Sequence, residues 1–195
     1  MSSELMRLTN DRHLNRVRVP LVTVLSIIAV CCSSPAAETD KAPAKIGVYD
    51  SRAIAVAFAG SKIHEEQLRM VADKSKAAKA AGDTAQVKEF EDQMRQQQKE
   101  LHRQGFSTAP VDKLLALVKD EVARVMKEKE VPMLVSKWDK DTLAKYPDAK
   151  QVDVTMALAD AFHPNERQRK NAVEVQKHKP VPLDELEKHL EKEGH

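Results

Sequence analysis

Large apolar side chains are scarce in this chain. Aromatic residues make up only 4% of its 195 residues and include a single Trp, whereas 32% of the residues are charged. Such a composition excludes a thick globular core and favours long helices that bury one stripe and expose the rest. Helices of this kind are weakly stable on their own, so we expect the protein to form oligomers.

Signatures of catalytic, phosphate-binding and metal sites are lacking as well. The sequence contains no Gly-rich phosphate loop, no Cys-x-x-Cys pair and no His-Glu-x-x-His motif. Its adjacent carboxylates, Glu65-Glu66 and Glu91-Asp92, are direct neighbours on expected helices and therefore do not face one another. We predict that the protein is not an enzyme and that it uses neither a cofactor nor a metal ion.

A surplus of charge of one sign is missing from most of the chain. Residues 1–37 carry four Arg against Glu4 and Asp11. Removing these from the 32 basic and 30 acidic residues of the whole chain leaves 28 of each. A balanced chain argues against nonspecific binding to nucleic acid, so we expect no nucleic-acid partner.

No apolar run is long enough to span a bilayer. The run at residues 21–30 is about half of the ~20 residues that a membrane helix requires. It follows an Arg-bearing segment and precedes the small residues at 33–37, an order typical of a secretion signal. We therefore predict a signal peptide over residues 1–37, a linker over residues 38–44, and a location in the periplasm or cell envelope.

Cysteine occurs only at the end of this apolar run. Cleavage near Ala36 or Ala37 would remove both Cys31 and Cys32 and leave the mature chain without a structural disulfide. Alternatively, one of the two cysteines becomes the acylated first residue of a lipoprotein, with residues 33–44 as a tether to the membrane. Residues 28–31 match a bacterial lipobox at the first two positions and depart from it at the third. Both interpretations remain open.

Two short apolar segments, residues 45–50 and 131–138, are predicted to be strands. The roughly eighty residues between them are mostly helix formers, with a turn signal at Gly82-Asp83-Thr84. Helices joined by so short a turn lie antiparallel. We predict an α+β fold, predominantly α, in which an antiparallel helical-hairpin (coiled-coil) arm at about 52–130 protrudes from a small β-sheet body. The residues expected in the core of the body, or between bodies in an oligomer, are Ile46, Val48, Leu134 and Val135.

Helical periodicity marks both sides of the arm. The first helix is expected to run for about 28 residues, or roughly 40 Å. In the second helix of the hairpin, apolar residues recur at alternating spacings of three and four, which is a heptad pattern. Gln97 is its one polar member, and the full set is Val87, Phe90, Met94, Gln97 and Leu101. Residues 105–110 are predicted to form a kink or short loop. A strong amphipathic stripe then covers residues 111–126 and leads into the second strand.

Most of these apolar side chains are expected to form the core of the hairpin. Exposed members near the arm would instead contact a partner, and Met is well suited to variable partners because it is flexible and polarizable. A cluster of Lys near the turn is either a solvated face or a surface that attracts acidic clients or lipid head groups. The candidate client-binding residues are Leu68, Met70, Met94, Lys74, Lys76 and Lys79.

Four short motifs follow one another between residues 45 and 162. They are Lys45-Ile-Gly-Val-Tyr-Asp50, Leu134-Val-Ser-Lys137, Tyr146-Pro147 and Asp153-Val-Thr155. In this order, around a helical hairpin and behind a secretion signal, they resemble the Skp/OmpH-like periplasmic chaperones (the outer membrane protein H family). The resemblance implies a homotrimer whose small sheets join in a central body, with arms that hold unfolded outer-membrane proteins without ATP.

A second hypothesis belongs to another class of protein. The chain would be a lipid-anchored structural or adaptor protein of the cell envelope that uses its coiled-coil hairpin for one specific partner. Residues 163–195 lie outside the resemblance and are predicted to be a polar extension, with a linker followed by a short amphipathic helix at Leu183, Leu186 and Leu190. This helix is expected either to fray or to dock on the body or a partner.

Overall fold

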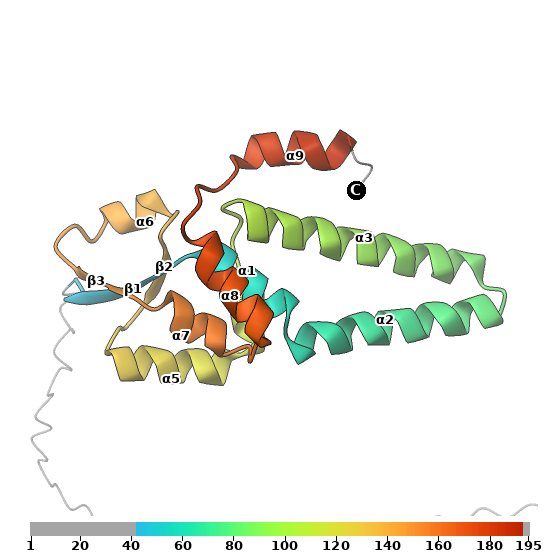
Figure 1. Cartoon of the computed structure of the whole chain (residues 1–195), viewed down its shortest axis with the longest axis horizontal. Coiled ribbons are helices and arrows are strands. Elements are labelled where there is room, and N and C mark those ends of the chain that lie inside the picture. The colour runs from blue at the N-terminus through green and yellow to red at the C-terminus, as the bar shows by residue number, and fades with distance from the viewer. Residues whose placement is uncertain (1–41, 193–195) are drawn as a thin grey trace, which may run out of the picture. The chain divides into compact units, whose positions relative to one another are not determined.

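The computed structural model describes residues 42–192 (Figure 1). The predicted signal peptide, with Cys31 and Cys32, lies outside the described residues. The described part is mainly helical with one small sheet, which confirms an α+β fold dominated by helices. Within it, no helix is long and apolar enough to cross a membrane.

The sheet has three parallel strands in the order β2-β1-β3, with β1 in the centre. The strands are β1 (Lys45–Tyr49), β2 (Leu134–Ser136) and β3 (Lys150–Asp153). The second strand is shorter than predicted and begins after Pro132, which cannot donate a ladder hydrogen bond. The third strand was not predicted because its sequence has a single large apolar residue, Val152. It pairs with β1 from Lys45–Lys150 to Val48–Asp153.

The first predicted helix is divided into α1 (Ser51–Ala59) and α2 (Lys62–Ala80). Asp50 caps α1, because its side chain accepts a hydrogen bond from the backbone N–H of Arg52. The glycine at the break, Gly60, is required by a contact with a residue distant in sequence. A Cβ atom at this position would lie 2.0 Å from Cγ of Gln168, so only glycine allows the close approach of the later chain. Ser61 then caps α2 through His64.

The turn predicted at residues 82–84 is confirmed. Gly82 has a φ of 72°, in the left-handed region that favours glycine, and the Asp83 side chain accepts a hydrogen bond from the backbone N–H of Gln86. From there α3 runs over Thr84–Phe106 and packs along α2 (Figure 1). The predicted interruption therefore begins at Ser107 rather than at Gly105, which lies inside α3.

The amphipathic stripe at residues 111–126 forms two helices rather than one. These are α4 (Asp112–Leu117) and α5 (Lys119–Lys129), and the chain bends between them at Val118, whose φ is −125°. The bend keeps Leu114, Val118 and Val125 in a common core. That core joins α1, α4, α5 and α7 (Thr155–Asp160) to one face of the sheet, and α6 (Lys140–Ala144) follows β2.

The C-terminal segment contains more structure than the sequence indicates. The expected linker at 164–179 contains α8 (Glu166–Val175), which packs against α1 and buries Ala172 completely. A weak apolar pattern hides this helix, because Ala172 is its one buried residue. The predicted amphipathic helix exists as α9 (Leu183–Lys192) and lies along α3 (Figure 1). Leu186 and Leu190 are buried there.

Two glycine substitutions should have opposite effects on stability. A Cβ atom at Gly47 would lie 2.7 Å from Leu134 Cδ2 and 3.1 Å from Val131 Cγ2, so Gly47→Ala should lower the free energy of unfolding by about 1 to 3 kcal/mol. Gly105 lies in a helix with nothing within 4 Å of such an atom, so Gly105→Ala should raise it by about 0.5 to 1 kcal/mol. Urea unfolding measures both changes, and equal effects would contradict this packing.

Candidate functional site

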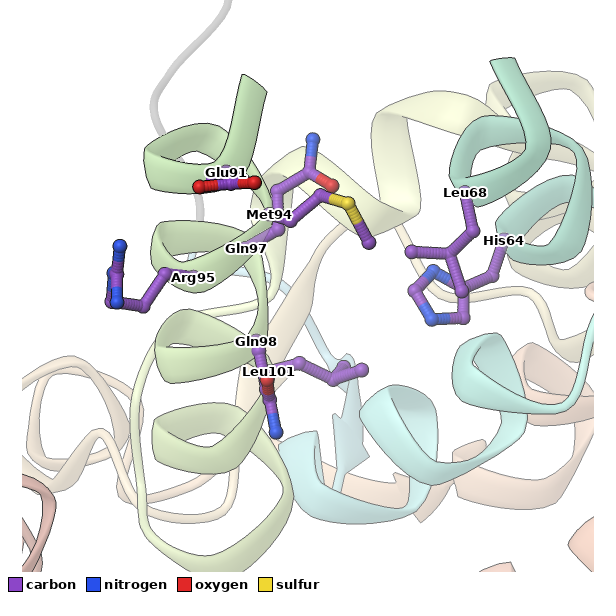
Figure 2. Close-up of a pocket in the computed structure, with 8 residues that line it drawn as sticks. All are labelled: His64, Leu68, Glu91, Met94, Arg95, Gln97, Gln98 and Leu101. Atoms are coloured by element: carbon purple, nitrogen blue, oxygen red, sulfur yellow. The ribbon is translucent and has the colours of Figure 1, made fainter. Parts of the chain in front are cut away.

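An apolar groove lies between α2 and α3, with a volume of about 630 Å³. Figure 2 shows Met94 and Leu101 pointing from α3 toward Leu68 and His64 on α2, whereas Arg95 points away. We call this cavity the α2–α3 groove. Its lining residues are His64, Leu68, Glu91, Met94, Arg95, Gln97, Gln98 and Leu101.

The groove continues toward the body of the protein. A second hollow of about 270 Å³ shares His64, Gln97 and Leu101 with it. This second hollow adds the apolar side chains of Phe58, Leu114 and Leu117, of which Leu117 is 45% exposed. A continuous apolar surface therefore leads from the α2–α3 pair to the base of α4.

His64 stands where the two hollows meet. Its ring lies 4.8 Å from the ring of Phe58, centroid to centroid. Burial lowers the pKa of His64 below its ordinary value of 6.5, because the charged imidazolium would lose contact with water. At neutral pH the ring is therefore uncharged and contributes to the apolar character of the groove.

Two of the predicted client-binding residues, Leu68 and Met94, meet in this groove from opposite helices. Met94 is 37% exposed, so its side chain is accessible to a bound molecule. The third apolar candidate, Met70, is 52% exposed but lies outside the groove lining. The structure therefore brings two of the three apolar candidates together across the groove and leaves Met70 on α2 outside its lining.

The three predicted lysines lie on the exposed surface of α2. Lys79 is 3.5 Å from a carboxylate oxygen of Glu91 on α3, so it forms an ion pair between the two helices. Such an exposed pair contributes at most about 1 kcal/mol. Lys74 and Lys76 lie further from the turn and remain solvent-exposed.

The residues predicted for the body core divide into two groups. Ile46 and Val135 are 0% and 3% exposed within the single chain, so they belong to its own core. Val48 and Leu134 are half-buried. Of these four residues, Val48 and Leu134 are therefore the two that keep exposed surface within the single chain.

A buried ionic cluster at the carboxyl end of the sheet was not predicted. Asp50 and Arg52 are both almost fully buried, and the guanidinium binds the carboxylate through two bonds, Nε–Oδ1 at 3.1 Å and Nη2–Oδ2 at 2.8 Å. Lys137 lies 2.5 Å from Oδ2, and Trp138 Nε1 donates to Oδ1 at 3.2 Å. The only sequence signal was the Asp-Ser-Arg run that follows the first strand.

The Asp50 carboxylate is occupied on both oxygens by donors. Burial alone raises the pKa of Asp50, but the hydrogen bonds from Arg52 and Lys137 outweigh it and hold this pKa below the ordinary 3.8. Such a carboxylate is a poor general base because its lone pairs are already used. The Arg52 and Lys137 cations also lie 5.0 Å and 4.6 Å from the centre of the Trp138 ring. We therefore assign the cluster a structural role.

Within residues 42–192, no group of three or more His, Cys, Asp and Glu side chains is arranged to hold a metal ion. In comparisons with protein-family models, with curated proteins and with solved structures, nothing matches this chain.

The depressed pKa of His64 predicts a pH-dependent stability. As the pH falls through 6.5, the unfolded state binds a proton that the folded state still rejects, so the free energy of unfolding falls until the lower folded pKa is passed. His64→Gln should show a shallower loss of stability between pH 7.5 and 5.5 in urea titrations. Identical slopes for the two proteins would show that His64 is freely solvated.

Removal of the Asp50 charge should destabilise the protein strongly. Asp50→Asn leaves Arg52 buried without its counter-ion, and loss of one partner from a buried pair costs about 3 to 5 kcal/mol. Urea unfolding of the variant measures this loss. Asp139→Asn is the matched control, because Asp139 is exposed and Asn is an equally good helix cap. An equal loss in the two variants would contradict the assignment.

Proposed function

We propose that this protein is an ATP-independent holdase chaperone of the periplasm or cell envelope that binds unfolded outer-membrane proteins. In this proposal the α2–α3 pair acts as the antiparallel hairpin arm of a Skp/OmpH-like chaperone. The observation that carries the proposal is the apolar groove in which Leu68, Met94 and Leu101 face one another across two helices.

The chemistry of the groove suits weak and variable binding. Its apolar side chains remove client side chains from water without requiring a particular partner shape, and Met94 can change rotamer to fit different residues. Gln97 and Gln98 add amide groups that can donate to and accept from an exposed polypeptide backbone. No covalent step is needed for such binding, so the proposal includes neither catalysis nor a cofactor.

The size of the groove favours several copies acting together, as the proposed homotrimer would. A cavity of about 630 Å³ is comparable to a site for a small molecule, so it accepts only a short stretch of an unfolded chain. Several arms around a shared body would raise the affinity through multivalent contact. Exposed Lys74 and Lys76 on each copy would add electrostatic attraction for acidic clients or lipid head groups. A lipid on Cys31 or Cys32 would place the assembly at the membrane.

A pair of methionine variants tests the groove directly. The purified protein, in several-fold molar excess and without nucleotide, should suppress the light scattering of a β-barrel protein diluted from urea. Met94→Glu should weaken this suppression several-fold, because a carboxylate in the groove must lose water on binding. Met70→Glu is the matched control, since it adds the same charge on the same helix pair outside the groove, and it should leave suppression unchanged.

Four outcomes would contradict parts of the proposal. Absence of suppression would contradict the chaperone function, and equal effects of the two variants would exclude the groove as the client site. A monomeric mass by light scattering would exclude a cavity between several arms. Recovery of one envelope protein together with indifference to unrelated unfolded chains would favour the lipid-anchored adaptor instead.

A further inference from the structure

The β2 strand has one unpaired edge. It pairs with β1 on one side, where Met133 C=O accepts from Gly47 N–H and Lys137 N–H donates to Tyr49 C=O. In a parallel strand the N–H and C=O groups of one residue point to the same side, and those of the next residue point to the other side. The backbone groups of Leu134 and Ser136 therefore point away from β1, to the other edge of β2. The Ser136 carbonyl there accepts from Asp139 N–H. Among the described residues, Leu134 N–H, Leu134 C=O and Ser136 N–H have no backbone partner.

A cavity of about 430 Å³ lies at this strand, and all three β2 residues line it. One wall comes from Thr108 and Pro110, between α3 and α4, and from Asp112, the first residue of α4. The other wall comes from the start of α6, with Trp138, Asp139 and Thr142. We call this cavity the β2 edge groove. It differs in position from the α2–α3 groove and shares no lining residue with it.

The β2 edge groove is acidic. Asp112 and Asp139 line it, and none of its lining residues is Lys or Arg. Burial raises the pKa of Tyr49, another lining residue, to about 12, and the negative charges of Asp112 and Asp139 contribute to this shift. Hydrogen bonds from Thr142 lower the pKa of Asp139, and the Lys145 cation adds to this effect and offsets part of the Asp139 charge. Asp112 has no comparable cation among the lining residues.

We propose that the β2 edge groove binds an extended peptide segment carrying Lys or Arg, which adds as a strand to the free edge of β2. Leu134 and Ser136 would supply the main-chain hydrogen bonds, and every second side chain of the peptide would face the groove. The two carboxylates would pair with its cations. The same charges oppose pairing of this edge with its own counterpart on a second copy, because like charges would meet.

The hydrogen-bonding part of the proposal is tested at Ser136. The probe is a fluorescein-labelled five-residue peptide of alternating lysine and valine, added to the full protein and followed by fluorescence anisotropy. Ser136→Pro removes the outward N–H at a position where an edge strand tolerates proline. It should weaken binding about tenfold. Ser136→Ala is the matched control, because it loses the hydroxyl but keeps the N–H, and it should bind like the parent protein.

The charge part is tested with a second peptide and a double variant. A peptide of alternating glutamate and valine should bind at least about tenfold more weakly than the lysine peptide at low salt. The double substitution Asp112→Asn and Asp139→Asn should remove this preference, while the cap of α6 is retained by Asn. Equal binding of the two peptides to the parent protein would overturn the proposal.

A peptide methylated on alternate backbone nitrogens tests strand addition without any change to the protein. It should lose binding in one of the two registers of methylation, because only alternate N–H groups face the edge. Retention of full affinity in both registers would overturn the proposal even if Ser136→Pro fails to fold. The edge could instead pair with another copy of the protein. In that case the peptide would not bind and Ser136→Pro would change the mass of the oligomer, and this result would also overturn the proposal.

This proposal stands independently of the chaperone activity. Met94→Glu should leave binding of the lysine peptide unchanged, and Ser136→Pro should leave suppression of aggregation unchanged, because the two grooves share no residues. Loss of both activities in either variant would indicate a single shared site and would overturn the assignment of the peptide to β2.

Discussion

Asp50 connects three parts of the chain that are distant in sequence, through its carboxylate and its backbone N–H. It caps α1, binds Arg52 of that helix, and accepts from Lys137 and Trp138 at the end of β2. Its own backbone N–H donates to Thr155 Oγ1 at the start of α7. Because the Asp50 carboxylate is fully buried and these contacts converge on one residue, they hold the carboxyl ends of all three strands against the first helix. The groove at the edge of β2 and the core beneath α1 both depend on this alignment.

The predictable part of the fold is the part governed by local signals. Glycine at 82 followed by aspartate at 83 specifies a helix end and a helix start, whatever the remainder of the chain does. The heptad pattern on the return helix includes Met94 and Leu101, and both of these residues line the α2–α3 groove. The α+β class follows from two apolar strand segments that flank a long run of helix formers.

The parts that could not be predicted depend on contacts between distant residues. The division of the first helix at Gly60 depends on Gln168, more than a hundred residues later. The helix at 166–175 has one buried residue, so its apolar pattern is too weak to recognise without α1 beside it. The burial of Arg52 depends on a carboxylate, an indole and a lysine that converge only when the sheet has formed. A polar side chain of this kind looks exposed in sequence.

The parallel sheet also bears on the timing of folding. The central strand at 45–49 pairs with residues 134–136 and 150–153, which come much later in the sequence. The helix α1 packs against α8, which follows later still in the chain. Contacts of such long sequence separation form slowly. A chain emerging from the ribosome therefore lacks the partners of its first strand until most of it has been synthesised.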